Sequence, residues 1–491
     1  MSENNKIKRF TSRSAALAYQ TCKRKRYYAY HWGQHGLSSE AIDLFLETGT
    51  SIHRGLQNLL EHCRLEHPDG SFEEQCINQS VELAINLFRE DISKASISLK
   101  ETEFAQAGWI IAEHECLIEG LIRAFAIKRL PTLLRDYEIL KVEFDEIFYE
   151  FSNIVFWQNK ADGEFLAFSD NTDYSNIWEH NRIPLGIIVL SIKTASEYAD
   201  NTIRNLLTDM QGNSEWAAAQ ARLDREFESY KEMINGLSYE EILELRKEHS
   251  SYTKYYQWCL ENDQKPKVYA VQYEHLVTGE WRDDDKTGLR KRRSFLVHPY
   301  KLSVMGTFSV FGNTSVTSPS TDYKWKVNPG RQPKGWERIN IWEDVGILNW
   351  INMLASGQVQ PEEGDPLENI IRTSELIFRD RNDGAQLKEW YESTKYQEEL
   401  IAKNLDILET HAEWAKKNNN WKLFETALNQ LFPKETQTCW NYYGRHCEYA
   451  RICHEMYNIN DLVTANILVP RSPHHEPEKL YHIERGFLKK C

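Results

Sequence analysis

The chain has 491 residues, 41% of them hydrophobic and 12% aromatic, which is enough for one large domain or two to three ordinary domains with real cores. The formal net charge of −14 argues against a surface that binds nucleic acid everywhere, although a local basic face would still allow DNA binding. No run is long and apolar enough to cross a membrane, and the N-terminus lacks the apolar segment of a secretory signal, so we expect a cytoplasmic protein.

The first predicted elements are helices. Residues 11–33 begin with a Ser/Thr cap and carry Cys22 beside the basic residues 23–26. That basic run is typical of either a solvated face or a phosphate contact, and the residues alone leave both open. Residues 47–62 form the next predicted helix, with an apolar stripe that should pack on a core. Its first turn holds His53, and a lone helical histidine is more often structural than functional.

Two strands are predicted near the middle of the chain, after a helical pattern over residues 73–135 and a strand over residues 136–151. The first of the two leads to Asp162 and a turn at Gly163. The second is the apolar, β-branched run of residues 184–194, which is typical of a buried strand closed by polar residues.

The end of the second strand carries the polar sequence Ser191-Ile192-Lys193. The two-residue period of a strand places Ser191 and Lys193 on one face and Ile192 on the other. Asp162 and Lys193 could therefore converge at the end of a sheet. This pair suits metal-assisted phosphodiester cleavage, in which a carboxylate holds Mg²⁺ or Mn²⁺ and a lysine orients water or offsets developing charge.

The rest of the chain alternates helices and polar loops. A charged helical arm is expected over residues 222–264, followed by a hairpin over residues 267–298. The hairpin tip contains Lys286 and the basic residues 290–293, which suit phosphate contact as well as a solvated turn. Residues 311–337 are rich in Gly, Pro and Ser and predict a long loop.

Three of the nine cysteines are closely spaced near the C-terminus, at Cys439, Cys447 and Cys453. Clustered cysteines among aromatic residues in a cytosolic chain indicate a metal site. Zinc would need a fourth ligand such as His446 or His454. A cubane iron–sulfur cluster takes four thiolates, and then Cys22 is the remote candidate.

The pattern of Asp162 with Ser191-Ile192-Lys193-Thr194 resembles the PD-(D/E)XK nuclease superfamily, and within it the RecB-like branch. Asp162 matches the first acid of the family pattern, and Lys193-Thr194 match its lysine and the residue that follows it. Ser191 stands where the pattern has its second acid. A hydroxyl is a much poorer ligand for a hard divalent cation than a carboxylate.

The resemblance implies roles for residues outside the two strands. In RecB-like nucleases a Gly-x-x-x-His pattern brings a metal-binding histidine to the site, and residues 49–53 match it with His53. Glu143 matches a glutamate on the preceding strand, and Gln211 matches a glutamine on the following helix. Glu164, two positions after Asp162, would share its face and could replace the missing acid.

The cysteines fit the same resemblance. An N-terminal cysteine with three C-terminal ones is similar to the iron–sulfur nucleases, which include AddB-type helicase-nucleases and CRISPR-adaptation nucleases. The resemblance implies a [4Fe–4S] cluster that staples the two ends of the nuclease domain. Its ligands would be Cys22, Cys439, Cys447 and Cys453.

The expected fold is therefore α/β, with a mixed central sheet of the restriction-endonuclease-like type flanked by helices, a helical insertion and iron–sulfur-stapled termini. The expected parts are an N-terminal helical part with Cys22 and His53 (1–135), a core sheet (136–310) with a helical insertion (about 207–265), a loop (311–337), a helical region (338–432) and a cysteine segment with tail (433–491).

The expected function is a metal-dependent DNA nuclease, an exonuclease in replication, recombination or repair. DNA and a helicase or other replication or repair protein are its expected partners. The alternative is a catalytically impaired DNA-binding or scaffold protein with the same fold, for which Ser191 is the argument.

Overall fold

The computed structural model describes most of the chain outside one long central stretch. The described residues are 7–40, 43–66, 73–94, 107–169, 183–195, 210–238, 241, 251–278, 280–283, 290–293, 371–378, 385–435, 439, 447–455, 459–465 and 467–486. The predicted loop over residues 311–337, Lys286 and His446 lie outside them.

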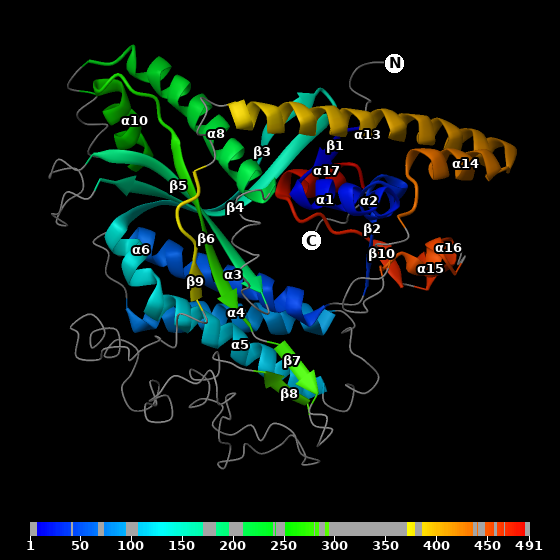
Figure 1. The fold of residues 1–491 in the computed structure, drawn as a ribbon, viewed down its shortest axis with the longest axis horizontal. Helices are drawn as coiled ribbons and strands as arrows, with labels where there is room; N and C mark the ends of the chain where they lie inside the picture. Colours follow the sequence, from blue (N-terminus) through cyan, green and yellow to red (C-terminus); the bar gives the residue numbers. More distant parts are fainter. Residues whose placement is uncertain are drawn as a thin grey trace.

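A six-stranded mixed sheet forms the centre of the molecule (Figure 1). Its strands are β1 (Arg9–Thr11), β3 (Tyr137–Ser152), β4 (Val155–Phe168), β5 (Pro184–Ala195), β6 (Val268–Val277) and β9 (Ile371–Thr373). The order is β1-β4-β5-β6-β9, with β3 on the other edge of β4. The pairs β1–β4 and β5–β6 are parallel and the others antiparallel, which confirms the predicted mixed sheet in an α/β fold.

The run of apolar residues in β5 reflects burial on both faces. Ile187 and Val189 pack in one core, whereas Leu190 and Ile192 pack in the core on the opposite face. A strand that is covered on both faces needs apolar side chains at successive positions. Its sequence is therefore an uninterrupted apolar run rather than an alternation of apolar and polar residues.

Helices α3 (Leu44–Glu66), α4 (Glu74–Lys94) and α5 (Ala107–Lys128) cover one face of the sheet, and α6 (Leu130–Asp136) leads into β3. The predicted apolar stripe of α3 is buried in the core between this helix layer and the sheet. A Cβ at Gly55 would lie 2.4 Å from Ile122 Cδ1 of α5 and 3.1 Å from the Ser80 carbonyl of α4, so the lack of a side chain at Gly55 lets α3 pack closely on both helices.

The opposite face is covered by α8 (Met210–Ile234) and α10 (Ser251–Glu261). Leu223, Phe227 and Tyr230 of α8 are buried against strand residues of this second core. The expectation of a charged arm over residues 222–264 was therefore wrong for these two helices, since their apolar stripes form a layer of the core.

The two ends of the chain pack together beside the sheet (Figure 1). The N-terminal elements are α1 (Arg13–Thr21), α2 (Lys23–Tyr30), η2 (Trp32–Gln34) and β2 (Leu37–Ser39). The C-terminal elements are α13 (Ala385–Asn418), α14 (Lys422–Leu431), α15 (Ala450–Cys453), α16 (Ile459–Thr464), β10 (Leu468–Pro470) and α17 (Glu476–Glu484). Strand β10 pairs with β2, so the two ends share a small antiparallel sheet.

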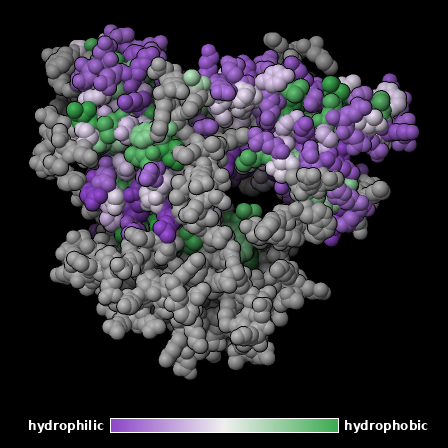
Figure 2. All heavy atoms as spheres, viewed as in Figure 1, coloured by the Kyte–Doolittle hydropathy of each residue, from purple (hydrophilic) through white to green (hydrophobic). Residues whose placement is uncertain are grey.

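Residues 267–298 do not form one hairpin that returns to the sheet. Strand β6 belongs to the central sheet, whereas β7 (Glu280–Asp283) and β8 (Arg290–Arg293) pair antiparallel in a separate two-stranded sheet. The basic residues 290–293 therefore form a strand rather than the tip of a hairpin. Figure 2 shows many hydrophilic side chains on the outer surfaces of α10, α13 and α14, as expected for helices whose apolar stripes face inward. None of the helices within the described ranges has the length and apolar character needed to cross a membrane.

Candidate functional site

Strand β4 has a break along one of its edges. That edge pairs with β1 through residues 155–157 and with β5 through residues 163–168. In the described part of the chain, the ladder leaves residues 158–162 between them without a strand partner on this side. Backbone groups at such a break need other partners, so polar side chains are expected to gather there.

Asp162 lies at this break. Its Oδ2 accepts a hydrogen bond from the Ile192 amide at 2.7 Å, where the β4–β5 ladder has just ended. Its Oδ1 lies 2.8 Å from Nδ1 of His53 on α3. The structure thus brings together three predicted features, namely the first acid, the helical histidine and the end of the second strand.

The surroundings of Asp162 favour its ionised form. Burial by itself would raise its pKa, but the charge of His53, the hydrogen bond from His53, the charge of Lys193 and the Ile192 amide together lower it. Asp162 is therefore a carboxylate at neutral pH, as a ligand for a divalent cation must be.

Helix α3 positions His53 through its contact with β5. The helix begins at Leu44, so His53 lies well inside it rather than in the first turn as expected. Gly49 precedes His53 by about one turn, and a Cβ at Gly49 would come within 2.8 Å of Thr194 Oγ1. The glycine of the Gly-x-x-x-His pattern therefore lets α3 lie close to the end of β5.

Ser191 and Lys193 share a face of β5, as the strand period predicted. Ser191 is fully buried and its Oγ donates a hydrogen bond to Oε1 of Glu215 on α8, at 3.2 Å. Lys193 is in register with His275 of the parallel strand β6. Ile192 packs on the opposite core.

The positive charge of Lys193 affects the pKa of His275. Burial, followed by the positive charge of Lys193, lowers the pKa of His275 from 6.5 to about 4. The imidazole is therefore neutral at neutral pH, and Lys193 is the cationic group at the end of β5.

This depressed pKa predicts a pH dependence of stability. The unfolded chain takes up a proton on His275 near pH 6.5 and the folded chain only near pH 4, so stability present above pH 6.5 is lost as the pH falls through that window. We expect His275→Gln to remove a term on the order of 3 kcal/mol from the acid-induced loss. Urea unfolding at pH 7, 5.5 and 4.5 measures it. An equally steep loss in wild type and variant would contradict the prediction.

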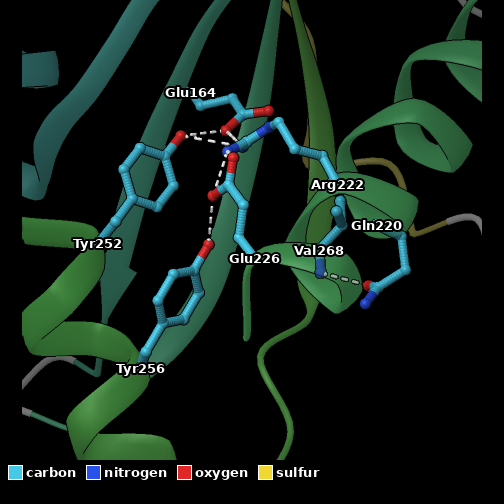
Figure 3. A network of polar contacts seen from close by, with 7 residues as sticks. All are labelled: Glu164, Gln220, Arg222, Glu226, Tyr252, Tyr256 and Val268. Carbon is cyan, nitrogen blue, oxygen red and sulfur yellow. Dashed lines mark hydrogen bonds and ion pairs between the residues drawn. The ribbon is translucent and has the colours of Figure 1, made fainter. Parts of the chain in front are cut away.

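Glu164 takes part in a different network (Figure 3). It is fully buried and contacts Arg222 of α8 and the Tyr252 hydroxyl of α10. Arg222 also bonds Glu226 at 2.9 Å, and the Tyr256 hydroxyl donates to Glu226 at 2.7 Å. These contacts lie on the α8–α10 face, whereas Asp162 contacts α3, so the structure does not bring Glu164 to the His53 side of Asp162.

Glu143 lies across from Asp162 on the neighbouring strand, and its side chain pairs with Lys160. Its place on β3 is between the partners of Gly163 and Ala161. Burial lowers the pKa of Lys160, and Asp162 opposes that effect, so Lys160 lies within electrostatic range of Asp162. Glu143 has a positive φ of 37°, a backbone conformation that is uncommon for a non-glycine residue and often found near functional sites.

Helix α8 supplies one residue that the sequence did not single out. Gln211 lies in the first turn of α8, but its side chain lies outside the described part of the structure. Glu215 lies four positions later and is the residue that contacts Ser191. The four-residue spacing from Gln211 was the available signal, because it places both residues on one helix face.

The four cysteines of the expected cluster lie in one neighbourhood. The Cys447 amide donates to the Cys439 carbonyl at 3.0 Å. Burial raises the pKa of Cys439, and Cys22 raises it further. Burial raises the pKa of Cys453 to about 11, with smaller contributions from Cys447 and Cys22. The fold thus gathers thiols from both ends of the chain.

His454, the histidine considered as a zinc ligand, lies beside one of these thiols. Its Nε2 lies 3.1 Å from Cys439 Sγ. Within the described residues, no group of three or more His, Cys, Asp or Glu residues is arranged to hold a metal ion. Thiols with raised pKa values would release protons on binding a metal.

Two of the basic residues 23–26, Arg24 and Arg26, have partners inside the protein. For these two arginines, neither a solvated face nor a phosphate contact, the two alternatives left open by the sequence, is correct. Arg24 is buried and donates to the Phe432 carbonyl at 2.8 Å. Arg26 is buried and forms an ion pair with Glu398 at 2.9 Å. Charge reversal at this run would therefore disturb folding as well as any DNA contact.

No family model and no curated protein matches this sequence. The geometry around Asp162 and the motif resemblance are therefore the observations that bear on function.

Proposed function

We propose that this chain is a metal-dependent DNA nuclease of the PD-(D/E)XK type, an exonuclease in replication, recombination or repair. One observation carries the proposal. The ionised Asp162 lies where β4 and β5 part, bonded to His53 on one side and to the strand that ends in Lys193 on the other.

Asp162, His53 and Lys193 would have different roles in phosphodiester hydrolysis. Asp162 would hold Mg²⁺ or Mn²⁺, and His53 would orient that carboxylate through the contact between Nδ1 and Oδ1. Such an ion lowers the pKa of a bound water and offsets charge on the phosphate. Lys193 would orient the water oxygen that attacks phosphorus as the bond to the leaving oxygen breaks. Mg²⁺ demands near-ideal octahedral geometry, and this site has Ser191 in place of the second acid, so we expect faster cleavage with Mn²⁺.

A second candidate is a DNA-binding or scaffold protein that has lost cleavage. The observations in its favour are the buried hydroxyl of Ser191 at the second acid position and the absence of a three-residue metal group among the described residues. Such a protein would keep its affinity for DNA without cutting it.

The test uses the full chain and end-labelled linear DNA, with Mn²⁺, Mg²⁺ or EDTA. The proposal expects labelled ends to be released with Mn²⁺ and retained with EDTA. Circular DNA of the same sequence is the control, because an exonuclease leaves it intact. Binding to linear DNA without any Mn²⁺-dependent loss of label would favour the second candidate.

We also propose that Cys22, Cys439, Cys447 and Cys453 hold a [4Fe–4S] cluster, supported by their shared neighbourhood. Anaerobically purified protein should be brown, with broad absorption near about 400 nm. Cys22→Ser should lose this absorption and unfold more easily, because the site would join distant segments. Cys259→Ser is the matched control, since this buried thiol lies in α10. Colourless protein with one equivalent of zinc would show that Cys439 and His454 belong to a zinc site.

A further inference from the structure

Lys160 lies beside Asp162 in the stretch of β4 that has no strand partner on one edge. In the described part of the chain, residues 158–162 lie between the segments that pair with β1 and β5. Lys160 and Asp162 are two positions apart, so their side chains leave the same face of the strand, with Cα atoms about 7 Å apart. The Lys160 side chain is 31% exposed and the Asp162 side chain 20%. A ligand that reaches Asp162 from solvent therefore passes close to the ammonium group of Lys160.

Glu143 of β3 holds Lys160 in the free protein. Strands β3 and β4 run side by side (Figure 1), and Glu143 lies across from Asp162 in their ladder. The Glu143 carboxylate forms an ion pair with Lys160 and its side chain is 18% exposed. Its φ of 37° is a conformation that costs free energy for a residue with a side chain. The backbone is thus held in an unfavourable conformation at the position where this carboxylate meets the lysine.

Positive groups surround Asp162 on this face of the sheet. Burial lowers the pKa of Lys160, Asp162 raises it and Arg54 lowers it, so these three groups lie in one electrostatic neighbourhood. Arg54 follows His53 on α3, and its side chain is 41% exposed. Lys193 adds its charge from the end of β5. Cations therefore approach the carboxylate from two strands and one helix.

This arrangement suits a substrate that carries negative charges in a row. DNA has a phosphate at every nucleotide, so a phosphate held at Asp162 brings a neighbouring phosphate into the same region. The ammonium group of Lys160 has three donors, and a part-exposed ion pair such as Lys160–Glu143 contributes little to stability. A phosphate can therefore take the place of Glu143 on Lys160 at small cost.

We propose that Lys160 binds the DNA phosphate next to the one that is cut, and that Glu143 competes with this phosphate for the ammonium group. The inference rests on the proposed nuclease function. The contact forms when DNA binds, before any bond is broken, and it needs no metal ion. Lys160 thus has a different role from the one proposed for Lys193, which is to orient the attacking water.

The first experiment measures binding of the full chain to fluorescent linear DNA in EDTA, at several KCl concentrations. Lys160→Gln should weaken binding and reduce the slope of log affinity against log salt concentration by about one, because one phosphate contact is lost. Lys160→Arg should keep the slope. Lys231→Gln is the matched control, since Lys231 also pairs with a glutamate, Glu228, but lies on α8, and this variant should bind like wild type.

Glu143→Gln should change affinity in the opposite direction. The amide keeps the shape of the side chain but no longer competes with phosphate as a charged group, so DNA binding should tighten by about two- to fivefold, the range of a part-exposed ion pair. Glu150→Gln is the control, because it removes the same charge from an exposed position of β3 and should leave affinity unchanged.

DNA strands with a single uncharged methylphosphonate locate the contact. Wild type should lose affinity when the uncharged group stands next to the phosphate that is cut, because Lys160 then has no anion to bind. Lys160→Gln should show no further loss at that position. Equal losses in the two proteins at every position would overturn the inference.

The outcomes separate the inference from the proposed function. An unchanged salt slope in Lys160→Gln, together with Mn²⁺-dependent cleavage by wild type, would overturn the inference and leave the nuclease proposal standing. A slope that depends on Lys160 in a protein that never cuts DNA would support the phosphate contact and remove the nuclease. Thermal unfolding in EDTA verifies that each variant folds. If Lys160→Gln does not fold, Glu143→Gln decides, since wild-type affinity in that variant would overturn the inference.

Discussion

Replacing Asp162 with alanine is expected to reduce Mn²⁺-dependent DNA cleavage by about 1000-fold, since a metal ligand supports several kcal/mol of transition-state stabilisation. DNA binding should stay close to wild type, because most protein–DNA affinity comes from contacts to the phosphate backbone. Initial cleavage rates at saturating DNA, with binding measured in EDTA, give the two quantities.

The control for this variant is Asp91→Ala. Asp91 is an acid near α3 that bonds Arg54 at 2.8 Å, so the change removes one charge close to the site without touching the break in β4. Cleavage should persist in Asp91→Ala. Equal activity in Asp162→Ala and wild type would show that the His53–Asp162 pair is structural.

Arg222→Met is expected to destabilise the protein by about 3–5 kcal/mol, because it leaves a buried carboxylate without its cationic partner. Glu164 is fully buried, and Tyr252 would be its main remaining contact. Urea unfolding at neutral pH measures the loss. A loss below about 1 kcal/mol would mean that water or a proton compensates Glu164 without cost.

The double variant Glu164→Leu/Arg222→Met is the matched control, and it should recover most of the lost stability, since an apolar pair can replace a buried ion pair. The pH dependence gives a second readout. Burial raises the pKa of Glu164 despite Arg222, so its stabilising contribution is present below the unfolded pKa and is lost as the pH rises through the folded pKa. Without Arg222 this loss should deepen, and Arg222→Met should be closer to wild type at pH 5 than at pH 8.

The sequence was informative where a local pattern determines the structure. The apolar run of β5 could be read as a buried strand, and its two-residue period correctly placed Ser191 and Lys193 on one face. The stripe of α3 is equally local, since one helical face had to meet a core. The resemblance of residues 49–53 to the Gly-x-x-x-His pattern implied that His53 reaches the site, and the approach of α3 to Thr194 gives the position of Gly49 a physical cause.

Partners distant in the chain could not be predicted in this way. Arg26 belongs to a basic run, and nothing near it in sequence reveals that it pairs with Glu398 in the interior. Glu164 lies two positions after Asp162 on β4, but its partner Arg222 comes from a helix expected to project from the fold. Glu215 was missed for the same reason, since only the packing of α8 on β5 distinguishes it from other glutamates of a charged helix.

The pairing of the two chain ends has a consequence for synthesis on the ribosome. Arg24 bonds the carbonyl of Phe432, 408 positions later, and Leu37 accepts a bond from Tyr449. At roughly 5–20 residues per second, the first segment waits about 20–80 s for its partner to be translated. During that interval its tyrosines remain accessible to chaperones. The nascent chain therefore completes this part of its fold only after residue 449 has been translated, and a transcript that stops before that point yields a polypeptide in which Arg24 and Leu37 lack these partners.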